Sequence, residues 1–158
     1  MSQEKDFLTI SSDDWDRMLA VNLRGPFLLT KYVLKGMINS GWGRIINISS
    51  IGGQWGGLNQ VHYAASKAAL INFTRSMAKL YSKNGVTTNC IAPGLIQTNM
   101  SDNELNSEEG KKKVAAIPIG RIGTTEELNS VIDFLLSDQS GYVTGQTINL
   151  NGGMLFST

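Results

Sequence analysis

Three short apolar segments, separated by stretches with a helical pattern, constrain the fold of this chain more than any other feature. They cover residues 44–49, 86–91 and 146–150. The first two are predicted to be strands buried on both faces, of the kind found in parallel sheets. Helices of 10–20 residues alternating with such strands favour an α/β fold with parallel strands. The sequence therefore predicts an α/β fold whose sheet has only three strands.

Helix signals surround these strands. Ser11 is followed by Asp14, and Thr124 by Glu127, and each pair has the spacing of a capping box. Apolar residues then recur with helical periodicity. The expected helices cover residues 11–40, 63–82, 99–113 and 124–136. There are no repeats and no linkers, so we expect a single domain over residues 1–158.

The composition is that of an ordinary globular domain, with 41% apolar residues, 17% charged residues and a net charge of +1. This balance gives no basis for a nucleic-acid partner. No apolar stretch approaches the roughly 18 residues of a membrane span, so no membrane partner is expected. The basic run Lys111-Lys112-Lys113 is expected to be a solvated helix face.

The chain has a single cysteine, Cys90, which rules out an internal disulfide and fits a reducing, cytoplasmic location. Because Cys90 lies within an apolar strand, we expect an inert buried thiol. No cluster of His, Cys, Asp and Glu has the spacing of metal ligands, and no metal site is expected.

Tyr63 and Lys67 lie one helical turn apart in the segment YAASK, and Ser50 ends the first strand thirteen residues before the tyrosine. A free tyrosine has a pKa of about 10 and exchanges protons poorly at pH 7. A lysine ammonium on the same helix face favours the phenolate, and a serine hydroxyl could hold the reacting oxygen. Ligands of open α/β sheets bind beyond the carboxyl ends of strands. Ser50, Tyr63 and Lys67 are therefore predicted to be catalytic, while alternation points Ser49 to the other face.

The simpler alternative is a surface tyrosine and lysine that share a helix face. His62, beside Tyr63, is expected to be a bystander because the site already has a proton donor. The glycines at 52, 53, 56 and 57 predict a flexible loop. Trp55 in that loop is expected to pack, with a substrate-pocket role as the less favoured alternative.

Pro26 lies within the first predicted helix and has no N–H, so the carbonyl of Asn22 loses its hydrogen-bond partner. A kink there is expected to leave this carbonyl able to hold a water that links Lys67 to solvent. The alternative is that Pro26 only bends the helix around the core.

The second strand ends at Pro93-Gly94, where glycine lets the backbone turn close to a ligand. The Ile96 backbone and Thr98 are then placed to meet a polar carboxamide. The pattern P-G-x-x-x-T also occurs as an ordinary strand exit, and its weight comes from its order and spacing with the other motifs.

These motifs, taken in order, resemble the short-chain dehydrogenase/reductase family, most closely its 3-oxoacyl-acyl-carrier-protein reductase and acetoacetyl-CoA reductase group. The landmarks are VNLRGPF, GRIINISS, YAASK, N-x-I-A-P-G-x-I-x-T and NLNGG, between residues 7 and 154. The resemblance implies a catalytic tetrad of Asn22, Ser50, Tyr63 and Lys67. In it Asn22 holds the relay water, Ser50 holds the substrate carbonyl and Tyr63 is the general acid/base.

The same resemblance implies NADP or NAD as cofactor, and reduction of a 3-oxoacyl thioester or similar small-molecule ketone. Lys67 would bind the nicotinamide ribose and favour the phenolate of Tyr63. The residues expected to contact the cofactor are Tyr63, Lys67, Pro93, Gly94, Ile96 and Thr98. The alternative function is a non-catalytic remnant that serves as a structural or interaction module with other chains.

The sequence departs from the family pattern in one respect: it contains neither T-G-x-x-x-G-x-G nor N-N-A-G. The resemblance implies a Rossmann-type, doubly wound sheet of order 3-2-1-4-5-6-7, of which this chain holds strands 5, 6 and 7. We expect impaired activity, and an exposed apolar edge on the first strand. An oligomer is therefore expected, joined through that edge or through the long helices. Either a natural loss or a misplaced start codon would account for the shortening.

Overall fold

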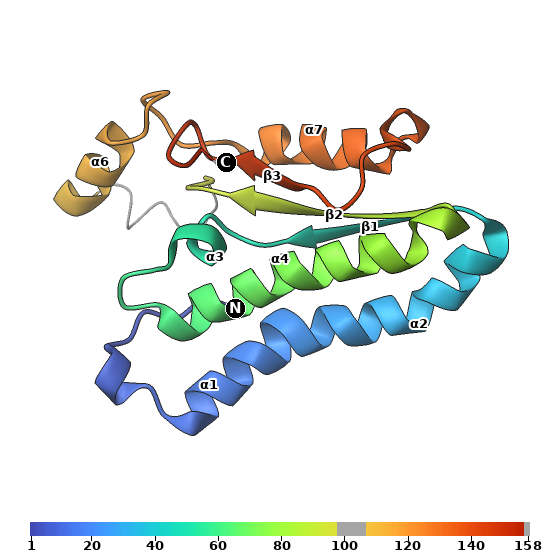
Figure 1. Cartoon of the computed structure of the whole chain (residues 1–158). Helices are drawn as coiled ribbons and strands as arrows, with labels where there is room; N and C mark the ends of the chain where they lie inside the picture. The colour runs from blue at the N-terminus through green and yellow to red at the C-terminus, as the bar shows by residue number, and fades with distance from the viewer. Residues whose placement is uncertain (98–106, 157–158) are drawn as a thin grey trace.

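A parallel sheet of three strands forms the centre of the computed structural model, which describes residues 1–97 and 107–156 (Figure 1). The strands are β1 (Gly43–Ile48), β2 (Val86–Pro93) and β3 (Thr147–Leu150), in the order β1-β2-β3. Cys90 of β2 lies opposite Asn47 of β1 and Thr147 of β3, which fixes the register of both pairings. The predicted α/β fold and its three parallel strands are confirmed.

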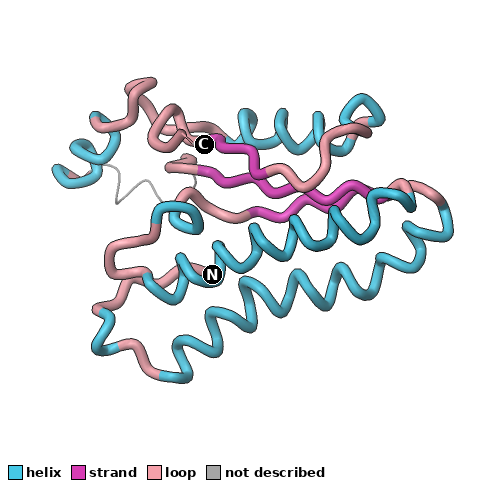
Figure 2. Tube along the Cα trace, in the orientation of Figure 1, coloured by secondary structure: helices cyan, strands magenta, loops and turns pink. Residues whose placement is uncertain are grey.

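Helices cover both faces of the sheet, as in a doubly wound fold. The long helices α2 (Gly25–Ser40) and α4 (Val61–Tyr81) lie on one side, and α7 (Thr125–Leu136) lies on the other (Figures 1 and 2). The shorter elements are η1 (Phe7–Thr9), α1 (Ser12–Leu19), η2 (Ala20–Arg24), α3 (Gly52–Trp55), η3 (Ser82–Asn84), α6 (Glu108–Ala115) and η4 (Asp138–Ser140).

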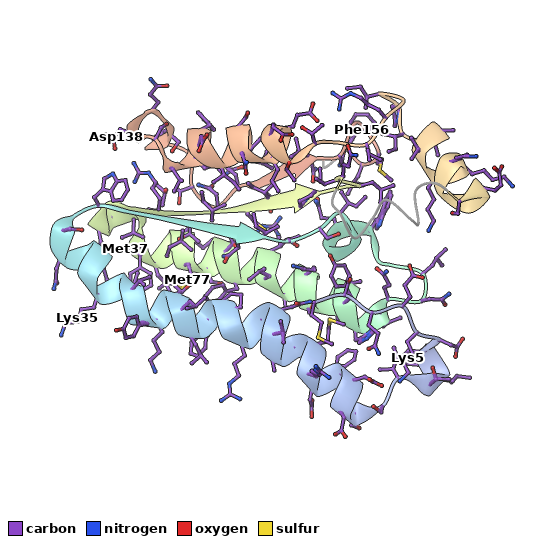
Figure 3. All side chains as sticks on the ribbon, turned by 180° about the vertical axis from the view of Figure 1, so that it is seen from behind. Lys5, Lys35, Met37, Met77, Asp138 and Phe156 are labelled. Carbon is purple, nitrogen blue, oxygen red and sulfur yellow. The ribbon has the colours of Figure 1, made fainter. Side chains whose placement is uncertain are left out.

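The core lies between α4 and the sheet, with β2 as its most buried element. Residues 86–92 are all buried, and burial raises the pKa of the Cys90 thiol to about 11. This confirms the predicted buried thiol. Met77 of α4 fills part of the layer beneath the sheet (Figure 3). Asn47 of β1 donates a 2.9 Å hydrogen bond to Thr74 Oγ1 of α4, so a polar pair inside the core is satisfied.

Both predicted capping boxes are present, at Ser11 with Asp14 and at Thr124 with Glu127. The helix expected over residues 11–40 is present as one continuous helical run from residue 12 to residue 40, and its middle is π-helical rather than α-helical. A π-helical turn, η2, separates α1 from α2 just before Pro26. Proline cannot supply an N–H to the regular ladder, and a π turn is a common way for a helix to absorb such a break.

Other boundaries were misjudged. The predicted flexible loop is wrong over residues 52–55, which form the short helix α3 against α4. β2 ends at Pro93, as the Pro93-Gly94 signal predicted, and so extends two residues beyond the expected range of 86–91. The polar helix expected at 99–113 is α6, over Glu108–Ala115, and its three lysines are exposed as predicted. Residues 98–106 lie outside the described part of the chain.

An ion pair between Arg121 and Glu127 at the start of α7 lowers the pKa of the Glu127 carboxyl group. The Arg121 guanidinium donates to both carboxylate oxygens of Glu127, at 3.0 and 2.7 Å, and the Thr124 N–H donates at 2.9 Å. These bonds hold the pKa of Glu127 at about 2, against an ordinary value of 4.5. The carboxylate therefore stabilises the fold above about pH 4.5, and this contribution is lost as the pH falls toward 2.

We expect Arg121→Gln to raise the pKa of Glu127 toward its ordinary value, as measured by NMR titration of the side-chain carboxyl carbon. Arg75→Gln, at an exposed position on α4, is the matched control and should leave the Glu127 titration unchanged. A pKa that stays near 2 in Arg121→Gln would show that the Thr124 N–H and the helix end suffice.

Candidate active site

Ser50 and Tyr63 border one small space at the carboxyl end of β1. Ser50 follows the strand, Tyr63 lies in the first turn of α4, and α3 connects them. A Cβ placed on Gly52 would lie 3.5 Å from Ser50 Oγ and 3.8 Å from Tyr63 Cε1. The Gly52 N–H donates to Ser50 Oγ at 3.1 Å, which helps to fix the hydroxyl oxygen. The structure thus brings these two predicted site residues together, and glycine keeps the space between them open.

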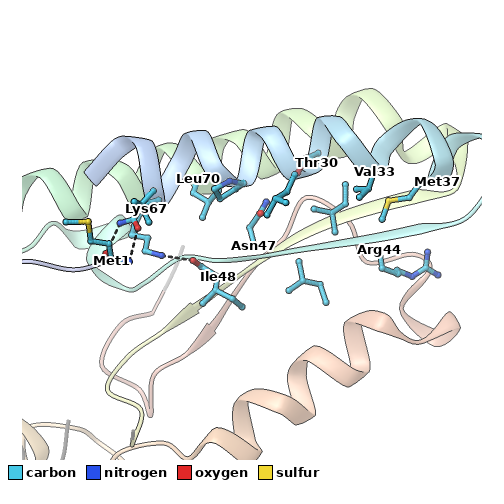
Figure 4. A pocket seen from close by; sticks show the side chains of 15 residues that line it. Met1, Thr30, Val33, Met37, Arg44, Asn47, Ile48, Lys67 and Leu70 are labelled. Carbon is cyan, nitrogen blue, oxygen red and sulfur yellow. Dashed lines mark hydrogen bonds between the residues drawn. The ribbon is translucent and has the colours of Figure 1, made fainter. Parts of the chain in front are cut away.

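Lys67 completes this cluster from the next turn of α4. Its Nζ lies 5.7 Å from the centroid of the Tyr63 ring and donates a 2.8 Å hydrogen bond to the Ile48 carbonyl (Figure 4). Burial lowers the pKa of the Lys67 ammonium. A partly desolvated cation interacts more strongly with nearby groups than one in bulk water. Lys67 is therefore placed to stabilise negative charge on the phenol.

Ser49 faces α4 from the end of β1 and has contacts different from those of Ser50. Its side chain is buried, and its Oγ donates to the Lys67 backbone carbonyl at 2.9 Å. This bond ties the end of β1 to α4 at the level of the lysine. The two adjacent serines therefore have separate environments, and only Ser50 borders the space beside Tyr63.

Close packing of α3 on α4 holds this geometry. A Cβ on Gly53 would come within 2.9 Å of the backbone of Lys67 and Ala68, with no flexible side-chain end to move aside. We expect Gly53→Ala to push α3 away from α4 and to lower the free energy of unfolding by about 1–3 kcal/mol. Urea denaturation followed by circular dichroism would measure the change.

Gly36→Ala is the matched control for this substitution. A Cβ at Gly36, within α2, would meet nothing within 4 Å. Alanine should therefore stabilise that helix, by roughly 0.5–1 kcal/mol. If Gly53→Ala proved as stable as Gly36→Ala, the tight contact between α3 and α4 would be contradicted.

Asn22 lies in the π turn and reaches the same region through Ser66. Its Nδ2 donates to Ser66 Oγ at 3.0 Å, and Ser66 Oγ donates to the Tyr63 carbonyl at 2.7 Å. The Asn22 side chain also bonds to the amino group and carbonyl of Met1. Asn22 is thus close to the cluster through its side chain, and the relay role of its carbonyl stays a prediction. Sequence reasoning missed Ser66, which lies on the buried face of α4 together with His62 and Thr74.

The loop after β2 approaches the cluster at its start. The Pro93 carbonyl accepts a 3.0 Å hydrogen bond from Ile51 N–H, next to Ser50. Gly94 has a packing reason of its own, and its predicted closeness to a ligand stays a prediction. A Cβ there would lie 3.0 Å from the Cα and Cβ of Asn151, so the close approach is made by the loop after β3.

Ile96 forms an isolated parallel bridge with Gly123, in which the flanking residues Leu95 and Gln97 make the hydrogen bonds. This bridge ties the loop after β2 to the segment before α7. Thr98, the remaining predicted contact, lies outside the described residues.

Three further side chains lie near the cluster or were singled out by the sequence. Gln54 of α3 hydrogen-bonds to Asn149 of β3, a link that sequence reasoning missed. Trp55 is 52% exposed, so its pocket role stays untested. His62 is fully buried, and its Nε2 contacts Gln3 Oε1 at 3.0 Å. The histidine contacts the N-terminal segment, which fits the predicted bystander.

Within residues 1–97 and 107–156, no group of three or more His, Cys, Asp or Glu side chains could hold a metal ion. In the same part of the chain, no helix has the length and apolar character needed to cross a membrane.

The parallel strands, with helices on both faces of the sheet, form part of a Rossmann-type α/β fold. A serine, a tyrosine and a lysine gather at the carboxyl end of its first strand. The chain belongs to the short-chain dehydrogenase/reductase family, and the family model described as enoyl-(acyl carrier protein) reductase matches residues 1–155. Among curated relatives, the 3-oxoacyl-[acyl-carrier-protein] reductase of Aquifex aeolicus is 46% identical over 98% of this chain and 62% of its own length. Nodulation protein G of Rhizobium meliloti is 45% identical over 94% of this chain and 60% of its own length.

Solved structures agree with this assignment. A protein described as an NAD(P)-dependent gluconate 5-dehydrogenase from Beutenbergia cavernae, with bound NADP, superposes with a TM-score of 0.94 at 34% identity. That match covers 99% of this chain and 64% of the other. A 4-hydroxyisoleucine dehydrogenase mutant complexed with NADH and succinate gives a TM-score of 0.93 at 29% identity, over 98% and 64% of the two chains. The chain thus spans under two thirds of the length of these relatives.

Proposed function

We propose that this chain is the catalytic part of an NAD(P)-dependent oxidoreductase that reduces a 3-oxoacyl thioester, or a similar ketone, to a secondary alcohol. The observation that carries the proposal is the convergence of the Ser50 hydroxyl and the Tyr63 ring around Gly52, with the Lys67 ammonium 5.7 Å from that ring. The Aquifex aeolicus and Vibrio cholerae relatives, both named 3-oxoacyl-[acyl-carrier-protein] reductases, support the substrate class.

The proposed roles follow from the chemistry of each group. Tyr63 donates its phenolic proton to the substrate oxygen as that oxygen gains charge. Ser50 donates a hydrogen bond to the same oxygen, and Lys67 stabilises the phenolate left behind. The nicotinamide cofactor, when bound, supplies the hydride. Asn22 positions the Tyr63 turn through Ser66, and its proposed relay water would return a proton to the site.

The substrate class named for the curated relatives favours a ketone. A carbonyl oxygen accepts hydrogen bonds from two hydroxyl groups at once, so the pairing of Ser50 and Tyr63 around one space suits such a substrate. The relatives named 3-oxoacyl reductases support a ketone over the enoyl group in the description of the family model.

The donors present fit the nicotinamide end of NAD or NADP. The Tyr63 hydroxyl and the Lys67 ammonium suit ribose hydroxyls, and the proposed loop contacts are Pro93, Gly94, Ile96 and Thr98. The sequence contains no T-G-x-x-x-G-x-G turn to hold the pyrophosphate at a helix N-terminus. We therefore propose weak cofactor binding by these 158 residues alone.

The test is a calorimetric titration of NADPH and NADH into the purified chain, paired with an assay of acetoacetyl-thioester reduction. Saturable binding below millimolar concentration, together with turnover, would support catalysis by this chain. Absence of binding up to millimolar cofactor would overturn it and support the non-catalytic alternative, in which the chain associates with other chains.

Self-association stays a prediction. An apolar groove of about 740 Å³, lined by residues that include Leu23, Phe27 and Phe73, runs between the α1–α2 region and α4. The long helices expected to meet a partner form its walls. Light scattering at micromolar concentration would contradict the expected oligomer if it gave a monodisperse monomer.

A further inference from the structure

Helix α3 carries one large apolar side chain that is not fully packed, that of Trp55. This residue is 52% exposed. α3 itself lies just beyond the carboxyl ends of the strands, beside the Ser50–Tyr63 space (Figure 1). A fully buried tryptophan removes about 150–250 Å² of its surface from water, so a large apolar area at the rim of the site is left for a ligand.

The helical turn sets the direction in which Trp55 projects. The Trp55 N–H donates to the Ile51 carbonyl at 3.1 Å, as in a regular α-helical turn. Successive residues of such a turn are rotated by about 100°, which places residues three apart on one face. Trp55 therefore shares a face with Gly52, the residue that borders Ser50 and Tyr63. The indole is thus placed at the mouth of that space, one turn further from the strand end.

The other sides of α3 are already occupied. Gly53 packs closely on the backbone of α4, and Gln54 hydrogen-bonds to Asn149 of β3. Since Gly52 and Gly53 have no side chain, Trp55 is the one side chain of α3 that is left to meet a ligand. The same contacts hold α3 in one orientation, so the indole is positioned before any ligand binds, which lowers the entropic cost of binding.

The surroundings of Trp55 suit an apolar, uncharged ligand. Residues 51–61 contain no charged side chain. Two further apolar side chains are open to solvent at this end of the sheet: Leu58, 94% exposed, in the loop after α3, and Phe156, 82% exposed, in the C-terminal segment (Figure 3). Apolar side chains that gather beside a site have the chemistry of a ligand-binding surface. A free carboxylate finds no partner in residues 51–61, whereas a hydrocarbon chain loses contact with water there.

We propose that Trp55 is a specificity-determining residue, whose indole receives the apolar acyl chain of a 3-oxoacyl thioester and so favours longer chains. The inference rests on the proposed function, because it concerns the same substrate. With the carbonyl oxygen held by Ser50 and Tyr63, the acyl chain extends toward the mouth where Trp55 lies. Each methylene group taken out of water raises the affinity by about 4-fold when it is fully buried, and by about 2-fold when half of it is covered.

Nuclear magnetic resonance of the native chain tests the proposal without any need for turnover. The chain has three tryptophans, Trp15, Trp42 and Trp55, and each gives its own indole N–H signal. The probes are the 3-hydroxybutyryl and 3-hydroxyoctanoyl thioesters of N-acetylcysteamine, which differ by a run of methylene groups. We expect the Trp55 signal alone to shift, with a midpoint at an at least about 10-fold lower concentration for the longer thioester.

Trp42 is the internal control for this titration, because its Nε1 donates to Asp138 at the opposite end of β1. An unmoved Trp55 signal, or equal midpoints for the two thioesters, would overturn the proposal.

A matched set of variants gives a second test. Trp55→Phe keeps an apolar ring, whereas Trp55→Gln keeps an uncharged side chain without the ring. In calorimetric titrations, Trp55→Phe should retain most of the preference for the longer thioester, and Trp55→Gln should bind the two thioesters within about 2-fold of each other. Tyr32→Gln, at an 88% exposed position on α2, is the control and should keep the parent preference. A preference that survives in Trp55→Gln would overturn the proposal. If a variant fails to fold, the Trp55 signal of the native chain still decides.

Failure of this inference and failure of the proposed function give different results. Binding at Trp55 that depends on chain length, without any reduction of acetoacetyl thioester, would uphold the inference and count against catalysis by this chain. Reduction of the thioester with an unmoved Trp55 signal would uphold catalysis and overturn the inference.

Discussion

Replacing Tyr63 by phenylalanine is expected to abolish ketone reduction and to leave the fold intact. The substitution removes the phenolic proton donor and keeps the ring that lies 5.7 Å from Lys67 Nζ. A positioned general acid typically contributes about 10²–10⁴-fold to the rate. We expect kcat to fall by that factor, because water is a poor substitute for a donor held against the substrate oxygen. Initial rates of NADPH oxidation with an acetoacetyl thioester would measure the loss.

The control for this substitution lies on the same helix. Tyr81 is at the far end of α4, so Tyr81→Phe removes a phenolic hydroxyl at a distance from the Ser50–Tyr63 space. It should retain the parent rate and melting temperature. If Tyr63→Phe kept more than about a tenth of the activity, proton donation would have to come from another group.

A loss of activity in Tyr63→Phe has a specific meaning only if cofactor affinity is unchanged. The variant loses the proposed ribose contact of the Tyr63 hydroxyl but keeps Lys67 and the loop after β2, so the Kd for NADPH should rise by no more than a few-fold. A nearly unchanged Kd with a much lower kcat indicates a role in the chemical step. A raised Kd with an unchanged kcat would instead assign Tyr63 to binding alone.

The sheet could be predicted from the sequence because its signals are local. Residues 86–91 carry no charged side chain and are rich in β-branched residues, a composition that suits a strand covered on both faces. Ser50 and Tyr63 could likewise be predicted to meet, since one ends a strand and the other begins the next helix. Strand alternation predicted different environments for Ser49 and Ser50, and their contacts differ.

The features that the sequence did not predict depend on contacts between distant residues. The glycines at 52 and 53 favour a loop by propensity, yet packing against Lys67 and Ala68 of α4 holds these residues in α3. The close approach of Gly94 to Asn151 was not predicted, because Asn151 is far away in the sequence. Tertiary packing determines both the α3 helix and the contact of Gly94, and local sequence propensity carries no information about such packing.

Gly85→Ala is expected to destabilise the chain more than any other glycine-to-alanine change at the β1–β2 end of the sheet. Gly85 has φ +76° and lies between η3 and β2. A Cβ there would come within 1.9 Å of the Gly41 carbonyl oxygen, a backbone atom with little freedom to move. The left-handed conformation costs about 1–2 kcal/mol for a residue with a Cβ, and overpacking adds about 1–3 kcal/mol.

Gly41→Ala is the control that separates the cost of the left-handed conformation from the cost of overpacking. Gly41 also has a positive φ, +66°, but a Cβ there would meet nothing within 4 Å. Gly41→Ala should therefore lose only the conformational part, about 1–2 kcal/mol. Gly85→Ala should lose roughly 2–5 kcal/mol, which would lower the melting temperature by about 4–20 °C in a chain of this size. Gly43 N–H donates to the Gly85 carbonyl, so displacement of Gly85 would also disturb the start of the β1–β2 ladder. That ladder places Ser50 beside Tyr63. Equal melting temperatures for the two variants would therefore show that the turn can relax without moving the strands that carry the site.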